Sequence, residues 1–451
     1  MARIFRHYVA GSKLLLVSGD MALVGLATVL ATHWRHDFAA LAPPEPGYLA
    51  LSSLLAAIVM GAGLVAVGAY EPTTLADRRQ HMLRVLVGLF GGLVILSAML
   101  FLMPGLPLWR SVMALMLVLV LPMMVVWRWL ALGLLRSRRI SQKVLLLGES
   151  GGVDMVRTLL EAGGRRPLGM ILARHIPEDP GPAAIQDALA SGVHVIVVAR
   201  GAVLGGETLH SLIQCRLKGV AVLDALSFVE RIGGRVLVND LDSDWLLMSD
   251  GFQGGTLPER LVKRGGDVVV SLLFLVLTSP IFALAALAVG LSSKGPVFYR
   301  QARIGRGGVP FNLLKFRSMV MDAEKTGERW ADEGDPRVTP VGRIIRTLRI
   351  DEFPQALNVL AGQMSFVGPR PERPGFVREL SGAIPFYDER HTMKPGITGW
   401  AQISYPYGAS VEDARRKLEY DLYYVKNYSV FLDVLILLQT IRVILFPGGA
   451  R

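Results

Sequence analysis

Two adjacent carboxylates, Asp351 and Glu352, follow a run in which arginine recurs at every third position. These arginines are Arg343, Arg346 and Arg349, and their spacing places them along roughly one ridge of a helix. Neighbouring residues on a helix point about 100° apart, so the two carboxylates need not do the same job. One can face a reacting phosphorus atom as an ionised nucleophile, while the other holds or orients a metal ion. An isolated pair of this kind is typical of a solvated helix surface, so its interpretation depends on the rest of the chain.

A second polar segment precedes this pair, between Lys294 and Arg317, and it contains no acidic residue. Its sequence, GPVFYRQARIGRGGVPFNLLKFRSM, predicts short strands joined by a glycine-rich turn. Arginine side chains and backbone amides gathered in this way suit phosphate groups. A surface that binds lipid headgroups is the alternative on this segment alone.

The composition indicates a membrane protein with soluble parts. Of the 451 residues, 52% are hydrophobic and 19% are charged, whereas a typical soluble domain has about 25% charged residues. The net charge of +11 favours anionic partners, either phosphorylated ligands or the cytoplasmic leaflet. Nucleic acid is the weaker alternative and is not expected as a partner, because no nucleic-acid-binding module is visible. The single cysteine, Cys215, excludes an intramolecular disulfide and a multi-cysteine metal site.

Four apolar stretches of roughly 20 residues open the chain, and each is long enough to cross the hydrocarbon core. Basic residues are concentrated before the first stretch, between the second and third, and after the fourth. The positive-inside rule therefore predicts that both ends of this group lie in the cytoplasm. Asp20 interrupts the first stretch, which does not resemble a cleaved signal peptide. The stretches are Leu14–Ala31, Tyr48–Tyr70, Leu83–Met103 and Ser111–Leu135.

Strand and helix patterns alternate between Ser141 and Arg235, which predicts a parallel, doubly wound α/β domain. Gly148, Gly151 and Gly152 follow the first strand and match the dinucleotide-binding fingerprint only loosely, and no acidic residue convincingly ends the second strand. We therefore interpret these glycines as turn residues and assign no ligand to this domain.

The next apolar run, Asp267–Leu291, is long enough to cross a membrane, but its flanking charges argue against a crossing. Basic residues lie on both sides of it, so a full crossing would place one basic group outside. Pro280 removes an amide donor and bends or breaks a helix near the middle of the run, where Ser279 can satisfy a freed carbonyl. We predict a re-entrant helix that enters and leaves on the cytoplasmic side. A simple span with a proline kink is the alternative.

Five ordered segments together resemble the bacterial sugar transferases that load a hexose 1-phosphate onto a polyprenyl phosphate, the monotopic phosphoglycosyl transferases. The resemblance to the long form of this family covers essentially the whole chain. A further segment, YPYGASVEDARRKLEYDLYY, is similar to the branch found with exopolysaccharide systems. The five segments are KRGGDVVVS, the Ser279-Pro280 break, VFYRQARIGRGGVPFNLLKFRSM, LRIDEFPQALNVLAGQMSFVGPRP and KPGITGWAQ.

The resemblance implies roles for individual residues. Asp351 is the expected nucleophile and Glu352 its acidic partner, and both are expected to hold Mg²⁺. The break at Ser279 and Pro280 matches the family's re-entrant helix. The other expected residues bind substrates: the resemblance implies the nucleotide sugar at the Pro-Arg-Pro motif and the lipid phosphate at the basic pair before the re-entrant helix, and the arginine-rich segments add two arginines at phosphate groups. They are Pro369, Arg370, Pro371, Lys263, Arg264, Arg317 and Arg349.

The predicted architecture is a membrane protein that combines α and α/β structure. Residues 1–140 are expected to form a four-helix transmembrane bundle, and residues 141–257 a Rossmann-like α/β domain. Residues 258–451 are expected to form a re-entrant helix and a catalytic domain of mixed α/β structure. The last apolar stretch, Ser429–Phe446, suits either an interfacial helix or a packed core helix.

The implied activity is transfer of hexose 1-phosphate from a UDP-hexose to undecaprenyl phosphate, with release of UMP and a covalent sugar-phosphate intermediate on Asp351. This would be the first membrane step of exopolysaccharide biosynthesis. The expected location is the bacterial inner membrane, with the active site at the cytoplasmic face and membrane lipids as partners; a homodimer is left open. The alternatives are a non-catalytic scaffold of polysaccharide assembly and a membrane nucleotide-sugar dehydratase. The dehydratase requires a Tyr-x-x-x-Lys pair, which the sequence lacks.

Overall fold

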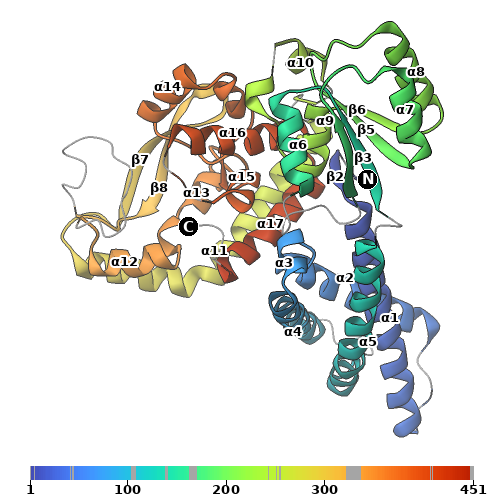
Figure 1. Cartoon of the computed structure of the whole chain (residues 1–451). Coiled ribbons are helices and arrows are strands. Elements are labelled where there is room, and N and C mark those ends of the chain that lie inside the picture. The colour runs from blue at the N-terminus through green and yellow to red at the C-terminus, as the bar shows by residue number, and fades with distance from the viewer. Residues whose placement is uncertain are drawn as a thin grey trace. The chain divides into compact units, whose positions relative to one another are not determined.

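The structure, a computed structural model, divides into two compact units that are described separately (Figure 1). The N-terminal unit comprises Met1–Ile4, Tyr8–Asp240 and Leu438–Phe446, and the C-terminal unit comprises Phe5–His7, Leu241–Leu437 and Pro447–Arg451. The structure describes residues 2–4, 6–40, 42, 45–102, 108–137, 141–161, 170–241, 243–249, 251–252, 255–320, 337–406, 408 and 410–446.

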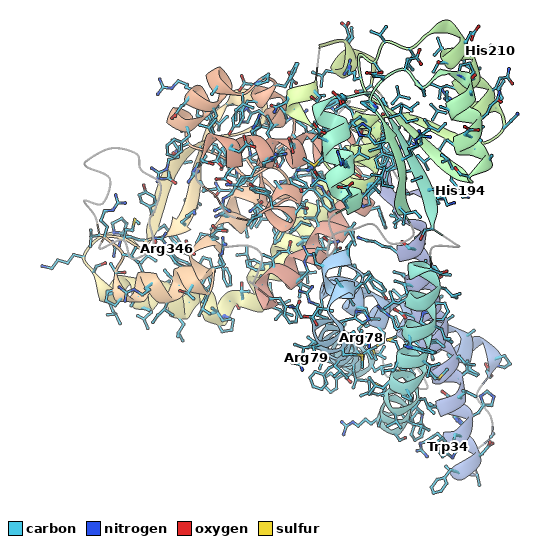
Figure 2. The ribbon with its side chains drawn as sticks, in the orientation of Figure 1. Trp34, Arg78, Arg79, His194, His210 and Arg346 are labelled. Carbon is cyan, nitrogen blue, oxygen red and sulfur yellow. The ribbon has the colours of Figure 1, made fainter. Side chains whose placement is uncertain are left out.

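The N-terminal unit begins with short strands and long apolar helices. Helix α1 packs against α2 and α5, and α2 packs against α4. Their shared core consists of leucine, valine, alanine and methionine side chains. Figure 2 shows Trp34 near one end of α1, and Arg78 and Arg79 at the start of α4. The elements are β1 (Ala2–Ile4), β2 (His7–Val9), α1 (Gly11–Phe38), α2 (Pro46–Ala66), α3 (Pro72–Ala76), α4 (Arg78–Leu102) and α5 (Arg110–Arg136).

Asp20 of α1 and Arg128 of α5 form a buried ion pair among these helices. Arg128 Nε lies 3.2 Å from Asp20 Oδ1, and the Tyr70 hydroxyl donates to Asp20 Oδ2 at 2.8 Å. Arg128 Nη1 also lies 3.4 Å from the Ala69 carbonyl oxygen and 3.4 Å from His81 Nε2. Groups from α1, α4, α5 and the segment after α2 therefore meet in one polar cluster, and such contacts hold apolar helices together in membranes.

The α/β part of the N-terminal unit contains a four-stranded parallel sheet in the order β4-β3-β5-β6. The sheet confirms the parallel arrangement that the alternating strands and helices predicted. Helices α7 and α8 share a core with Leu145, Leu147 and Ile196 of the sheet, while α6 packs against α9 (Figure 1). The elements are β3 (Gln142–Leu147), α6 (Gly151–Glu161), β4 (Met170–Ile176), α7 (Gly181–Ala190), β5 (Val193–Val198), α8 (Gly206–Leu217), β6 (Ala221–Asp224), α9 (Ala225–Gly233) and the 3-10 turn Val238–Asp240.

The C-terminal unit combines two small sheets with helices. Strands β7 and β8 form an antiparallel hairpin, and β9 pairs in parallel with β10. The elements are α10 (Ser243–Met248), α11 (Leu257–Ser292), β7 (Phe298–Ile304), the 3-10 turn Arg306–Gly308, β8 (Pro310–Phe316), α12 (Pro340–Thr347), the 3-10 turn Ile350–Glu352, α13 (Gln355–Leu360), β9 (Ser365–Val367), α14 (Pro374–Ala383), the 3-10 segment Tyr387–Thr392, β10 (Gly396–Thr398), α15 (Trp400–Ser404), α16 (Val411–Lys426) and α17 (Val430–Leu445).

Helix α11 is 36 residues long and carries Pro280 in its interior. The helix changes direction along its length (Figure 1), and the Ser279 hydroxyl donates to the Val276 carbonyl oxygen at 2.8 Å. Most of its apolar side chains are exposed, because it packs on the rest of the unit along one side only. Among the described residues, α1, α2, α4, α5 and α11 are long and apolar enough to cross a membrane.

The buried pair in the N-terminal unit generates a stability prediction. Replacing Asp20 with alanine leaves the Arg128 guanidinium without its counter-charge in an apolar interior. This should lower the free energy of unfolding by about 3–5 kcal/mol. The double variant Asp20→Ala/Arg128→Ala removes both charges and should be less destabilised than the single variant. Thermal unfolding in detergent measures both, with Lys13→Ala as a control, because the Lys13–Glu71 pair is more exposed. A double variant that is destabilised as much as Asp20→Ala, or more, would contradict this account.

Candidate active site

The paired carboxylates lie on the short 3-10 turn between α12 and α13. The Thr339 side chain caps the start of α12 by accepting from Gly342 N at 2.9 Å. After α12 the backbone of Arg349 takes a left-handed conformation, with φ 58° and ψ 16°, and turns the chain into the carboxylate pair. A non-glycine residue in this region carries strain of about 1–3 kcal/mol. The carboxylate pair therefore lies at a junction between two helical segments.

Glu352 is held by three cationic side chains that come from different parts of the sequence. Its Oε1 atom lies 3.0 Å from Arg370 Nη2, 3.5 Å from Lys315 Nζ and 3.9 Å from Arg349 Nη1. Burial alone would raise the pKa of Glu352, but Arg370, Lys315 and Arg349 outweigh burial and hold this pKa far below its usual value. Glu352 is therefore an ionised carboxylate that organises positive charge.

Asp351 is in a different environment although it is the next residue. Its side chain is buried, and within the described part of the chain no hydrogen bond or ion pair engages its carboxylate. Burial and the neighbouring Glu352 raise the pKa of Asp351, against the opposing effects of Lys315, Arg346 and Arg349. The oxygens of Asp351 therefore keep their acceptor capacity for a ligand or a reacting atom.

Lys315 reaches the carboxylates from the β7–β8 hairpin. Alternate residues of β8 face opposite sides, so the buried Phe316 packs against α11 while Lys315 faces the carboxylate pair. Burial lowers the pKa of Lys315, partly opposed by Glu352. Arg303 of β7 donates to the Pro371 carbonyl oxygen at 3.0 Å, and burial lowers its pKa to about 10.

The Pro-Arg-Pro motif follows β9, and each of its carbonyl oxygens accepts a hydrogen bond. Gly396 N donates to Pro369 O at 2.9 Å, and Arg390 Nη2 donates to Arg370 O at 3.0 Å. Arg303 bonds the third carbonyl, as described above. Because proline has no amide donor, these carbonyl bonds are the main way to fix this backbone. The motif is thereby held so that the Arg370 side chain reaches Glu352.

Glycines let the residue that follows β9 lie very close to the start of β10 and to the residue after β10. A Cβ atom at Gly396 would lie 2.1 Å from Gly368 N, and one at Gly399 would lie 2.2 Å from Gly368 O. Any larger residue at these positions would push apart the two segments that fix the Pro-Arg-Pro motif.

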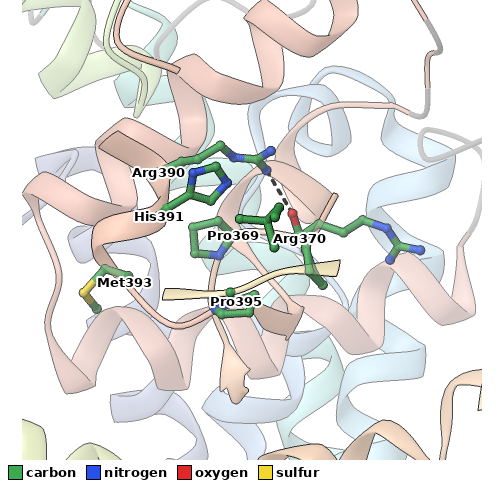
Figure 3. Close-up of a pocket in the computed structure, with 9 residues that line it drawn as sticks. Pro369, Arg370, Arg390, His391, Met393 and Pro395 are labelled. Carbon is green, nitrogen blue, oxygen red and sulfur yellow. Dashed lines mark hydrogen bonds between the residues drawn. The ribbon is translucent and has the colours of Figure 1, made fainter. Parts of the chain in front are cut away.

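A small pocket borders the Pro-Arg-Pro motif (Figure 3). Arg390 forms a buried ion pair with Asp421, with Nη2 and Oδ2 2.7 Å apart, and its Nη1 donates to the Tyr387 hydroxyl at 2.7 Å. Burial and Arg390 lower the pKa of His391 to about 4, so its imidazole is neutral at pH 7. The pocket is lined by Ile304, Gly305, Pro369, Arg370, Pro371, Arg390, His391, Met393 and Pro395.

Of the remaining predicted residues, two lie near the start of α11 and one, directly after β8, contacts the end of α11. Lys263 Nζ lies 2.7 Å from Asp433 Oδ2, and Arg264 donates to the Val359 and Leu360 carbonyl oxygens at 2.6 and 2.8 Å. At the other end, Arg317 Nη2 donates to the Ser293 carbonyl oxygen at 2.7 Å. The structure thus brings Asp351, Glu352, Arg349 and Arg370 together, and it gives Lys263, Arg264 and Arg317 partners within the protein.

Sequence reasoning missed four residues of this site: Lys315, Arg303, Arg390 and Asp421. Strand alternation in the predicted hairpin could have shown that the side chains of Lys315 and Phe316 face opposite sides of the strand. No local pattern indicates that Arg390 and Asp421, 31 residues apart, form a buried pair.

The two carboxylates offer a small set of oxygen ligands for the expected magnesium ion. Glu352 Oε1 already faces three cations, which leaves Asp351 and the second Glu352 oxygen as donors. Mg²⁺ is usually bound by one or two carboxylates and takes its other ligands from water and substrate phosphates. The two residues fit this partial set. No group of three or more His, Cys, Asp or Glu side chains suited to a metal occurs in the described part of the chain.

The segment that carries the site is similar to known proteins. The family model for "Bacterial sugar transferase" matches residues 258–447. A UDP-N-acetylgalactosamine-undecaprenyl-phosphate N-acetylgalactosaminephosphotransferase of Aeromonas hydrophila is 43% identical over 251 residues, which are 55% of this chain and 58% of the relative.

Two further relatives carry the name UDP-glucose:undecaprenyl-phosphate glucose-1-phosphate transferase. The Escherichia coli (strain K12) protein is 45% identical over 185 residues, which are 40% of this chain and 40% of the relative. The Caulobacter vibrioides protein is 43% identical over 202 residues, which are 44% of this chain and 76% of the relative. The chain therefore matches 58% and 40% of the lengths of the Aeromonas and Escherichia relatives.

The close backbone approach at the Pro-Arg-Pro motif generates a second prediction. Gly396→Ala should destabilise the C-terminal unit by about 1–3 kcal/mol or more, because the added methyl group meets backbone atoms that cannot move independently. The measurement is the thermal unfolding temperature. Gly382→Ala is the matched control, since a Cβ atom there meets nothing within 4 Å. Equal unfolding temperatures for the two variants would contradict the proposed close approach.

Proposed function

This chain belongs to the bacterial sugar transferase family, and we propose that it transfers a sugar 1-phosphate from a UDP-sugar to undecaprenyl phosphate and releases UMP. The observation that carries the proposal is the unequal environment of two adjacent carboxylates. Glu352 is held by three cations, while Asp351 is buried beside it with no bonded partner among the described residues. The names of the relatives supply the two substrate classes. Because these names include different sugars, the proposal extends to a UDP-sugar and not to one sugar.

In the first half-reaction, a carboxylate oxygen of Asp351 attacks the phosphorus atom that carries the sugar. The bond from this phosphorus to the bridging oxygen breaks, and UMP leaves with the bridging oxygen and its electron pair. The product is a mixed anhydride between the Asp351 carboxyl group and the sugar phosphate. Little covalent chemistry is required beyond this attack, so most of the catalytic effect must come from positioning and charge stabilisation.

The cations around Glu352 supply that stabilisation. Lys315, Arg349 and Arg370 converge on Glu352, the residue next to Asp351. We propose that they contact the phosphoryl oxygens of a bound substrate, because hydrogen bonds from cations to such oxygens are strong. Glu352 keeps these side chains in place before substrate binds, so little reorganisation is needed during the reaction. The two carboxylates therefore have different proposed roles: Asp351 reacts with the phosphorus atom, and Glu352 positions the three cationic side chains.

In the second half-reaction, a phosphate oxygen of undecaprenyl phosphate attacks the same phosphorus atom. The bond from phosphorus to the Asp351 oxygen breaks, and the carboxylate is restored. The product is undecaprenyl diphosphate that carries the sugar. Both half-reactions use one carboxylate in turn, as in ping-pong kinetics.

Magnesium is proposed as a cofactor held by Asp351 and the second oxygen of Glu352, together with substrate phosphates and water. When bound, it would neutralise negative charge on the diphosphate. The protein's own cations act on the same charge.

We propose that α1, α2, α4 and α5 form a transmembrane bundle and that α11 is re-entrant. Arg264, near the start of α11, donates a hydrogen bond to α13, and α13 packs against β8. Arg317, directly after β8, donates a hydrogen bond to the backbone at the end of α11. Both ends of α11 therefore contact one compact unit, whereas the ends of a crossing helix lie about 30 Å apart on opposite sides of the bilayer. This supports an active site at the cytoplasmic face of the bacterial inner membrane, where the phosphate of the lipid lies.

The nucleophile proposal predicts the behaviour of one variant. Asp351→Asn should lower the rate of UMP release from UDP-sugars by about 10⁴-fold or more, as expected when a nucleophile is removed. Its unfolding temperature should stay close to that of the wild type, because no described residue is bonded to the Asp351 carboxylate. Glu352→Gln is the contrasting variant and should lose both activity and stability, since it leaves the buried Lys315 ammonium without its counter-charge. Turnover by Asp351→Asn at the wild-type rate would refute the assignment.

The metal proposal has its own test. Chelation of divalent cations with EDTA should stop UMP release by the purified protein, and added Mg²⁺ should restore it, because the diphosphate would otherwise keep its full charge. Thermal unfolding with and without Mg²⁺, in the absence of UDP-sugar, should differ little, since the protein alone offers few ligands. Full activity in EDTA would contradict a role for the metal.

A further inference from the structure

Two polar side chains of α11, Lys263 and Asp267, lie one helical turn apart and contact strand β9. Asp267 Oδ1 accepts from the Ser365 hydroxyl at 2.8 Å and from Phe366 N at 2.9 Å. Lys263 Nζ donates to the Val367 carbonyl oxygen at 3.1 Å. Successive residues of β9 are therefore bonded to one face of α11, because residues four apart on a helix point the same way.

Lys263 has partners for all its donors within the protein. Besides Val367 O, its Nζ lies 2.7 Å from Asp433 Oδ2 of α17 and 3.3 Å from the Tyr424 hydroxyl of α16. The Tyr424 hydroxyl in turn lies 2.7 Å from Asp433 Oδ1. A lysine ammonium has three N–H donors, and these three partners account for them. The Lys263 side chain is also 12% exposed, so it is largely shielded from other ligands.

The strand that these side chains hold leads directly to the proposed active site. Val367 is followed by Gly368 and then by the Pro-Arg-Pro motif, whose Arg370 guanidinium lies 3.0 Å from Glu352 Oε1. A displacement of β9 would therefore be passed through two residues to Arg370. Such supporting contacts commonly change activity by about 10–100-fold when they are removed from around a site.

From this juxtaposition we infer that Lys263 and Asp267 are positioning residues, which hold β9 on α11 so that Arg370 meets Glu352, and that Lys263 is not a ligand of the lipid phosphate. The inference rests on the proposed function and changes the role that the sequence predicted for Lys263. It makes α11 part of the active-site framework as well as a membrane element.

The two roles for Lys263 affect different half-reactions. A positioning residue acts on Arg370, so its loss slows UMP release in a single turnover without lipid acceptor. A ligand of the lipid phosphate acts on the acceptor, so its loss raises that KM and leaves the single-turnover release of UMP unchanged.

The test compares Lys263→Met, Asp433→Asn and the double variant with wild-type protein. We expect each single variant to slow single-turnover UMP release by about 10–100-fold. The double variant should be no slower than the slower single variant, because the two residues form one pair. Lys294→Met, an exposed lysine just beyond the other end of α11, is the matched control and should release UMP at the wild-type rate. Lys263→Arg, which keeps the charge, should recover part of the loss.

Hydrogen exchange gives a readout that does not depend on activity. The backbone amides of the non-proline residues between 366 and 372 should exchange at least 10-fold faster in Lys263→Met and Asp433→Asn than in wild-type protein, while the Lys294→Met control stays unchanged. If wild-type protein releases no UMP from any UDP-sugar, the proposed function fails, but faster exchange still supports positioning. Unchanged exchange in a folded Lys263→Met variant, or an unchanged UMP burst with a raised KM for the lipid, would overturn the inference. If Lys263→Met does not fold, Asp433→Asn and Lys263→Arg decide by the same criteria.

Discussion

The convergence of Lys315, Arg349 and Arg370 on the Glu352 carboxylate is the interaction on which the rest of the active site depends. A buried lysine and a partly buried arginine need a counter-charge, since an unpaired buried charge is strongly destabilising. Glu352 provides it and stays ionised. Because the cations are engaged by Glu352, the adjacent Asp351 carries the only other charge of this short turn and has no bonded partner among the described residues. Two neighbouring carboxylates thereby acquire different chemistry.

Most of the C-terminal unit serves to bring these cations to one carboxylate. The β7–β8 hairpin carries Lys315, and the strained backbone of Arg349 directs the carboxylate turn. Strand β9, fixed by α11 on one side and by β10 on the other, carries the Pro-Arg-Pro motif. The near contact of Gly368 with Gly396 leaves little freedom in this part of the backbone. Through β9, the same helix that is proposed to enter the membrane also supports the site at which a lipid phosphate would react.

The sequence was sufficient to predict features that depend on local patterns. Apolar stretches predicted the long helices, and alternating strands and helices predicted the parallel sheet. Features that depend on long-range contacts were not predictable. The contact between Lys263 and Asp433 joins residues 170 positions apart, and no local pattern indicates it. The left-handed backbone conformation of Arg349 could not be predicted from the sequence either, because arginine has no preference for this conformation.

The most direct test of the division between Asp351 and Glu352 is the mass of the peptide that contains both residues. The purified protein would be incubated with a UDP-sugar in the absence of lipid acceptor, quenched in acid, digested and analysed by mass spectrometry. The account predicts a sugar-phosphate adduct on Asp351 that disappears when undecaprenyl phosphate is added. UMP release without any adduct, or an adduct on Glu352, would contradict it.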